Sequence, residues 1–141
     1  MTIHVKWGNN DKTILIWVFE AAWDWDEFYA SQEKSTAMLE TVSSHIVDVI
    51  ADMRHTRSLP SDMLSRYRQS RQFIAANEGR TVIVANLLVK TLAITYNSIF
   101  SRSADKLLVA DTLEEAYSLL IPIRQERDLR ASSAPDNGTT V

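Results

Sequence analysis

The sequence predicts a single α/β domain: a mixed, mostly parallel five-stranded sheet with about four helices, in the order ββαβαβαβα. Segments of strand length alternate with segments of helical periodicity. Most of the strand segments are continuous apolar runs, which is typical of strands that helices cover on both faces. A length of 141 residues suits one domain, and 45% hydrophobic with 23% charged residues is usual for a globular protein. We assign residues 1–122 to this domain and residues 123–141 to the end of the last helix and a disordered polar tail.

The first two strands are predicted to form a hairpin. Residues 2–7 are short and β-branched, residues 8–11 (Gly-Asn-Asn-Asp) are a strong turn signal, and residues 13–19 (TILIWVF) are apolar throughout. Because the second run does not alternate with polar residues, we expect that strand to be buried on both faces.

A first helix is predicted over residues 25–42, with Asp24 as its N-cap. Glu27 can return a hydrogen bond to the N–H of the cap, and Asp26 and Glu27 place negative charge where the helix dipole favours it. Acidic residues beside aromatic ones also suit acid–base chemistry, but capping explains the same residues and is favoured. Four tryptophans lie in this part of the chain, and we expect core packing ahead of a ligand-stacking site for them: Trp7, Trp17, Trp23 and Trp25.

A strand–helix pattern then repeats three times. Residues 46–52 are the third strand, residues 54–60 a polar loop, and residues 61–77 the second helix, which the Glu-Gly-Arg of residues 78–80 should end with a turn. The last helix opens with a capping box at residues 112–115 and should be kinked or ended by Pro122. The remaining elements are a fourth strand (81–85), a third helix (87–100) capped by Asn86, and a fifth strand (106–110).

The third helix is apolar on every side, and Lys90 is its only charged residue. A helix of this kind is buried on more than one face, by its own domain and by something else. A second copy of the chain would make it a dimer interface, and an apolar molecule would make it the wall of a ligand pocket. The residues that we expect on this dimer or ligand face are Leu88, Leu92, Tyr96 and Ile99.

The composition argues against several functional classes. A net charge of −3 does not favour nucleic-acid binding, and with no cysteine there is neither a disulfide framework nor a thiolate nucleophile. Three glycines cannot supply a P-loop or a dinucleotide fingerprint, and three scattered histidines do not predict a metal site. No segment resembles a secretory signal or a transmembrane span, so we expect a cytoplasmic protein without cofactor or metal.

The loop after the third strand holds the candidate site. Residues 53–72 contain five arginines against one acidic residue, a local charge of +4. Arg54 and Arg57, beside the hydroxyls of Ser58 and Ser61 and a helix N-terminus, predict a site for an anion or a protein partner. The alternative is that these arginines only solvate a surface loop and helix. His55 near Asp52 and a serine also invites a hydrolase triad, but without a G-x-S-x-G elbow we expect no enzyme.

The element order resembles that of the STAS domains, the anti-sigma-factor-antagonist family with its SpoIIAA-like members. The resemblance covers about residues 2–120. It depends on a strand that ends at Asp52 and Met53 before a hydroxyl-rich loop, on residues 79–84 (GRTVIV) before the third helix, and on residues 112–116 (TLEEA) at the start of the last helix. It implies a SpoIIAA/STAS-like fold.

In the signalling branch of that family, an Asp-Ser-Ser-Gly-Leu motif precedes the second helix, and its second Ser is phosphorylated. In this chain the motif falls on residues 60–64 (PSDML), so Ser61 and Leu64 match while Asp62 occupies the phosphoacceptor position. The resemblance therefore implies a divergent member without the usual phospho-switch. Asp62 either replaces the charge of a phosphoserine or serves the helix dipole. Ser58 and Ser61 remain candidates for modification.

Together these observations predict a non-catalytic, regulatory STAS-like interaction module that docks a protein partner through the loop and helix after the third strand. Homodimerisation through the third helix fits its surplus of apolar residues. The alternative is a binder of a lipid or another small apolar ligand, because some relatives of this fold resemble the SEC14 type.

Overall fold

The computed structural model describes residues 2–100 and 106–133. Its centre is a five-stranded sheet whose strands lie side by side in chain order. β1 is antiparallel to β2, as predicted for the hairpin, and every other neighbouring pair is parallel. The expected mixed, mostly parallel α/β architecture with five strands and four helices is therefore confirmed in the described residues. The strands are β1 (Ile3–Trp7), β2 (Ile14–Phe19), β3 (Val47–Met53), β4 (Glu78–Ala85) and β5 (Leu108–Ala110).

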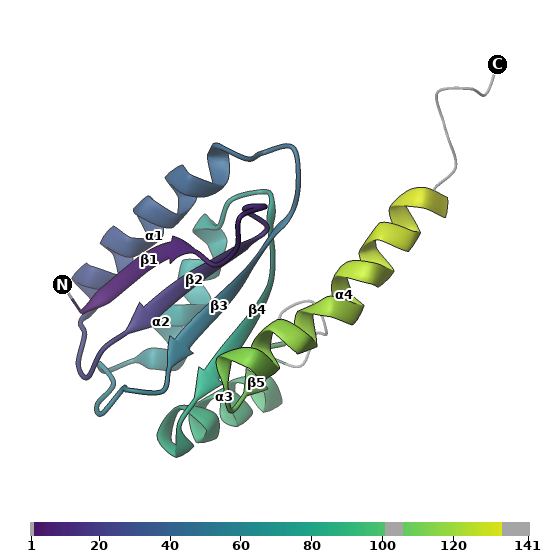
Figure 1. Cartoon of the computed structure of the whole chain (residues 1–141). Helices are drawn as coiled ribbons and strands as arrows, with labels where there is room; N and C mark the ends of the chain where they lie inside the picture. Colours follow the sequence, from purple (N-terminus) through teal and green to yellow (C-terminus); the bar gives the residue numbers. More distant parts are fainter. Residues whose placement is uncertain (1, 101–105, 134–141) are drawn as a thin grey trace.

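Helices cover both faces of the sheet (Figure 1). One apolar core joins the sheet to α1, α2 and α3, and a second core joins the opposite face to Ala116 and Leu120 of α4. β2 supplies side chains to both cores, and five of its six residues are buried, as its continuous apolar run predicts. The helices are α1 (Trp25–Glu40), α2 (Met63–Ser70), α3 (Leu87–Ile99) and α4 (Leu113–Ser133).

The predicted cap of α1 forms, but only one half of the predicted capping box does. Asp24 Oδ1 accepts a hydrogen bond from the Glu27 N–H at 2.8 Å. The Glu27 carboxylate does not return to the cap. It accepts hydrogen bonds from the backbone N–H and the hydroxyl of Thr2 instead, and so joins the start of the sheet to the first turn of α1.

The second helix is shorter than predicted. α2 ends at Ser70 and passes into a 3₁₀ turn (Arg71–Phe73), whereas the sequence predicts a helix over residues 61–77. Asn77 lies outside the helix, and its side-chain amide donates to the carbonyls of Leu39, Val42 and His45 at and just after the end of α1. Residues 78–80 belong to β4 and are not a turn, so this prediction was also wrong.

The last helix continues through Pro122 to Ser133, so the alternative that it ends at this proline was wrong. Pro122 lies on the exposed side of α4, where water can satisfy the carbonyl that loses its N–H partner. A contact beyond the proline holds the second half of the helix. Arg127 donates two hydrogen bonds to the carboxylate of Asp48, at 2.9 and 3.1 Å.

Asp48 is fully buried at the start of β3 and connects three elements. Besides the Arg127 guanidinium, its Oδ1 accepts the backbone N–H of Arg80 in β4 at 2.7 Å. Gly79 makes this contact possible, because a Cβ on that residue would overlap Asp48 Oδ1 and press on the Ile46 side chain. The glycine therefore serves a buried carboxylate and not a helix stop.

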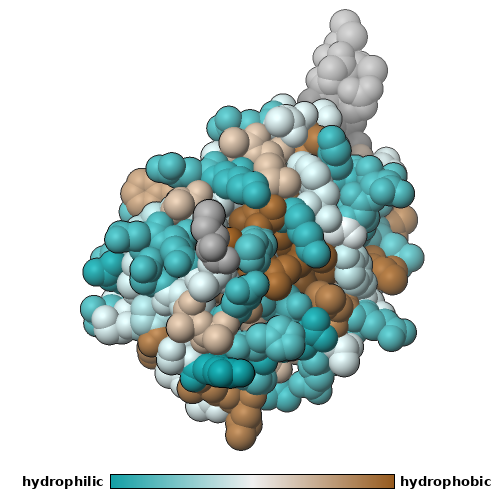
Figure 2. All heavy atoms as spheres, turned by 60° about the vertical axis from the view of Figure 1, so that its left-hand side comes forward, coloured by the Kyte–Doolittle hydropathy of each residue, from teal (hydrophilic) through white to brown (hydrophobic). Residues whose placement is uncertain are grey.

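The described surface is mainly hydrophilic on the side where α1 and β1 come forward, and hydrophobic atoms form a band near its centre (Figure 2). Within residues 2–100 and 106–133, no helix combines the length and the apolar character that a bilayer crossing requires.

We predict that Gly79→Ala lowers the free energy of unfolding by about 3 kcal/mol, because the added methyl group displaces Asp48 from its guanidinium partner. Urea unfolding followed by circular dichroism measures the change. In a double-mutant cycle with Asp48→Ala, the cost of Gly79→Ala should be clearly smaller, since the overlapping carboxylate is gone. Equal costs in both backgrounds would contradict this explanation.

Candidate functional site

The loop that follows β3, residues 54–62, lies at the carboxyl ends of the central strands and is held by its neighbours. The N–H of Arg57 donates to the carbonyl of Ala21 at 2.8 Å. The side-chain amide of Asn86 donates to the carbonyl of Thr56 at 2.7 Å, and the indole N–H of Trp25 donates to the carbonyl of Ser61 at 2.8 Å. Three separate segments therefore hold the backbone of this loop.

Asn86 has two roles. Its Oδ1 accepts the N–H of Val89 at 3.0 Å, which confirms the predicted N-cap of α3. Its Nδ2 holds the 54–62 loop through the carbonyls of Thr56 and, at 3.3 Å, Arg54. The loop after β3 and the start of α3 thus meet at one edge of the sheet.

Arg54, the first predicted site residue, already binds a carboxylate. Its Nε and one of its terminal nitrogens donate to the two oxygens of Asp52, each at 2.9 Å. Burial alone would raise the pKa of Asp52, but the hydrogen bonds from Arg54 outweigh burial and hold this pKa below its ordinary value. Arg54 therefore neutralises the charge of a buried carboxylate in β3. The charge count over residues 53–72 does not include this carboxylate, because Asp52 lies one residue before that segment.

The other predicted loop residues, Arg57, Ser58, Ser61 and Asp62, are all exposed. The Arg57 side chain makes no ion pair within the described part of the chain, so its charge faces solvent. The hydroxyls of Ser58 and Ser61 are accessible for modification. Asp62 adopts a left-handed backbone with φ of 60° immediately before α2, and its side chain makes no capping hydrogen bond.

The arginines of α2 and of the turn after it pack on aromatic rings. Arg66 lies 5.8 Å from the ring centre of Trp25, and Arg68 lies 4.4 Å from that of Phe100. Arg71 donates to Glu78 at 2.8 Å. Arg54 and Arg71 are thus paired with carboxylates, whereas Arg57 is exposed and has no ion pair among the described residues.

The four residues predicted on one face of the third helix are divided between two faces. Leu88 and Ile99 are 47% and 55% exposed, and Leu87 and Ile94 lie exposed on the same outer side. Leu92 and Tyr96 point inward and line a cavity between α3 and the sheet.

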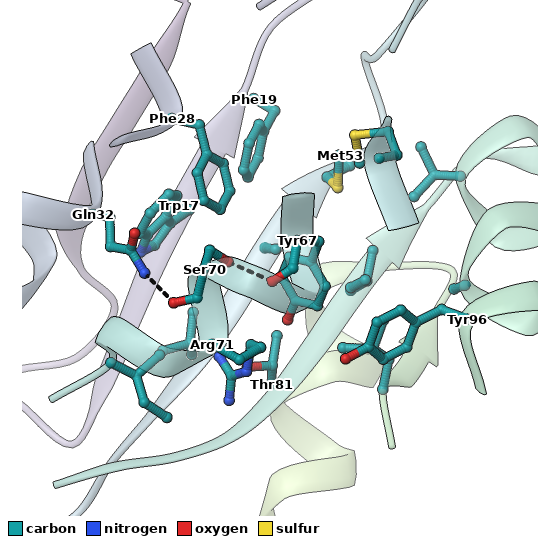
Figure 3. A pocket seen from close by; sticks show the side chains of 18 of the residues that line it. Trp17, Phe19, Phe28, Gln32, Met53, Tyr67, Ser70, Arg71, Thr81 and Tyr96 are labelled. Atoms are coloured by element: carbon teal, nitrogen blue, oxygen red, sulfur yellow. Dashed lines mark hydrogen bonds between the residues drawn. The ribbon is translucent and has the colours of Figure 1, made fainter. Parts of the chain in front are cut away.

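This interlayer cavity, of about 100 Å³, lies between the sheet and the layer formed by α1, α2 and α3. Figure 3 shows the rings of Phe19 and Phe28 with Met53 toward one end, and Arg71 with Thr81 toward the other. The sequence does not reveal this cavity, because its space depends on how side chains from six helices and strands meet. The inward spacing of Leu92 and Tyr96 was its only sequence signal.

The histidine and acidic side chains of the described ranges do not gather into a metal-binding group. No group of three His, Asp or Glu side chains there could hold a metal ion. His55 is exposed, and its ring makes no hydrogen bond to Ser58 or Ser61. No model of a protein family, no curated protein and no solved structure matches the chain.

We predict that Arg54→Met lowers the free energy of unfolding by about 1 to 2 kcal/mol at pH 7, a figure that allows for the partial exposure of Arg54. Because the folded-state pKa of Asp52 is lowered, the stability that ionised Asp52 contributes is present above its ordinary pKa of 3.8 and is lost as the pH falls through the folded-state pKa. The difference between the two proteins should therefore narrow in acid.

Urea titrations at several pH values between about 7 and 3 measure this difference. Arg57→Met is the matched control, because Arg57 has no ion pair among the described residues and its removal should change little at any pH. A difference for Arg54→Met that stays constant as the pH falls would contradict the assignment of its partner.

Proposed function

We propose that the protein is a non-catalytic, STAS-like interaction module that docks a protein partner. The docking surface consists of the 54–62 loop and the outer face of α2. The observation that carries this proposal is the loop itself, which is exposed and yet held by hydrogen bonds with Ala21, Trp25 and Asn86. A surface that is already ordered loses little conformational entropy when a partner binds.

The charge of the docking surface indicates the chemistry of the partner. Arg57 and Arg66 place positive charge on it, in a chain whose net charge is −3. An acidic protein surface complements this arrangement and would be steered toward it. The resemblance to STAS domains supports a partner in a regulatory pathway of the cytoplasm.

A second copy of the chain is our proposal for the outer face of α3. Leu87, Leu88, Ile94 and Ile99 are exposed there, and Thr91 and Thr95 between them direct their hydroxyls to carbonyls of their own helix, at 3.0 Å each. This face therefore presents methyl groups and few unsatisfied polar groups, as homodimer interfaces do.

Binding of a lipid acyl chain, the alternative from the sequence, has less support. Typical small-molecule sites have volumes of about 300–1,000 Å³. The interlayer cavity measures about 100 Å³. It is too small for an acyl chain in the conformation described.

We predict that Arg57→Glu weakens the complex with the partner by about tenfold or more, because it sets a negative charge against an acidic surface. Cross-linking and mass spectrometry of the tagged protein in its own host identify the partner, and titration of the purified pair measures its affinity. Lys34→Glu, with the same change of charge on the exposed side of α1, is the control and should bind normally. If the Arg57→Glu variant and the wild-type protein bound the partner with equal affinity, the proposal that this loop is the docking surface would be wrong.

We predict that Leu88→Glu combined with Ile99→Glu converts a dimer into monomers, since charge replaces apolar contact on the outer face of α3. Native mass spectrometry and light scattering measure the mass of both forms. The proposed interface would be contradicted if the wild-type protein were monomeric at tens of micromolar concentration, or if the variant were still a dimer.

A further inference from the structure

Small side chains on three elements help to leave the interlayer cavity open. Ser35 of α1, Ala51 of β3 and Ala93 of α3 all line it, where larger residues would fill the space. Large rings around them, including Trp17, Phe28 and Tyr96, keep the helix layer away from the sheet. Protein interiors are normally packed without voids of this size, so the space calls for an explanation.

Polar atoms in the cavity wall lack hydrogen-bond partners. Trp17 Nε1, Trp23 Nε1 and Ser35 Oγ are buried and unpaired in the described structure, and all three residues line the cavity. Ser35 is 2% exposed and the two tryptophans 8% and 7%. More than nine-tenths of buried polar groups in proteins find a partner. Because an indole N–H can only donate, the missing partner must supply a hydrogen-bond acceptor.

Other polar groups in the cavity wall already have hydrogen-bond partners. Gln32 donates to the carbonyl of Ser70 at 2.9 Å, and Arg71 pairs with Glu78 at 2.8 Å. Burial raises the pKa of Tyr67 to about 12, so its phenol is neutral at physiological pH. A charged ligand would have to displace Glu78 from Arg71 or remain unpaired in an apolar space, and either is costly. The cavity therefore favours a neutral ligand.

The volume of the cavity also limits the size of the ligand. An engineered apolar cavity of about 150 Å³ accepts benzene. With about 100 Å³, this cavity holds at most one ring. We propose that the interlayer cavity is a binding site for a neutral, single-ring molecule that carries one hydrogen-bond acceptor, and that it is distinct from the docking surface on the outside of α2.

Phenol and toluene are a matched pair of probes, since they differ only by a hydroxyl in place of a methyl group. Phenol can accept a hydrogen bond from an indole N–H and donate one to Ser35 Oγ, whereas toluene can do neither. We expect saturable binding of phenol, about fivefold tighter than that of toluene. Tryptophan fluorescence reports binding directly because Trp17, Trp23 and Trp25 line the cavity, and thermal unfolding should show a rise in Tm.

Three variants test the location and the hydrogen bond. Ala93→Leu fills the cavity and should weaken binding of both probes by about tenfold or more while Tm stays equal or rises. Ala30→Leu places the same side chain on the exposed side of α1 and should bind both probes normally. Ser35→Ala removes one hydroxyl and leaves the space intact, so it should weaken phenol by about threefold to tenfold and leave toluene unchanged.

Absence of a saturable signal with either probe would overturn the proposal. So would unchanged binding in a folded Ala93→Leu variant, or an equal loss of phenol and toluene in Ser35→Ala. If Ala93→Leu does not fold, Ser35→Ala decides alone. Arg57→Glu should bind phenol normally, so failure of the docking surface and failure of the cavity site remain distinguishable.

Discussion

A cluster of aromatic rings determines how the helix layer lies on the sheet. Its rings form a chain of contacts from β2 through the following loop into α1, with ring centres 5.2 to 6.0 Å apart. Edge-on and tilted contacts of this kind add to the free energy of burying large apolar surfaces. The same rings wall the interlayer cavity, and one of them holds the 54–62 loop through its indole N–H. The cluster comprises Trp17, Phe19, Trp23, Trp25 and Phe28.

Buried charges provide the second constraint. Asp48 and Asp52 lie four residues apart on β3, hence on the same face of the strand, and each has its own guanidinium. Arg127 comes from the far end of α4, whereas Arg54 comes from the adjoining loop. A buried ion pair adds little net stability, but leaving one of its charges unpaired is costly. These pairs therefore disfavour arrangements in which α4 or the loop lies elsewhere.

Local patterns in the sequence predicted the elements well. Apolar runs identified the strands, and Asp24 and Asn86 were recognised as helix caps because a cap depends on residues within one turn. The errors occurred where distant residues decide. The pattern around Gly79 predicts the end of a helix, but the fold places Asp48 beside this glycine. Pro122 is predicted to end α4, but Arg127 holds the helix beyond it.

The candidate site shows the same limit. Exposure of Arg57, Ser58, Ser61 and Asp62 follows from a polar loop at a strand end, and the sequence suffices for that. Which arginine remains available for a partner depends on Asp52, whose carboxylate turns toward Arg54 only in the folded chain. The interlayer cavity is harder still to predict, because no residue pattern in the sequence marks a place where side chains leave space unfilled.

The two proposed sites share one helix. The outer side of α2 carries Arg68 and belongs to the docking surface, while Met63, Leu64 and Tyr67 of its inner side line the cavity. A ring bound beneath α2 would press on the helix that a partner binds from outside. If the ring changed the affinity for the partner by some factor, linkage would require the partner to change the affinity for the ring by the same factor. Because the inner residues of α2 line the cavity and its outer side belongs to the docking surface, α2 is the element through which such a coupling would act.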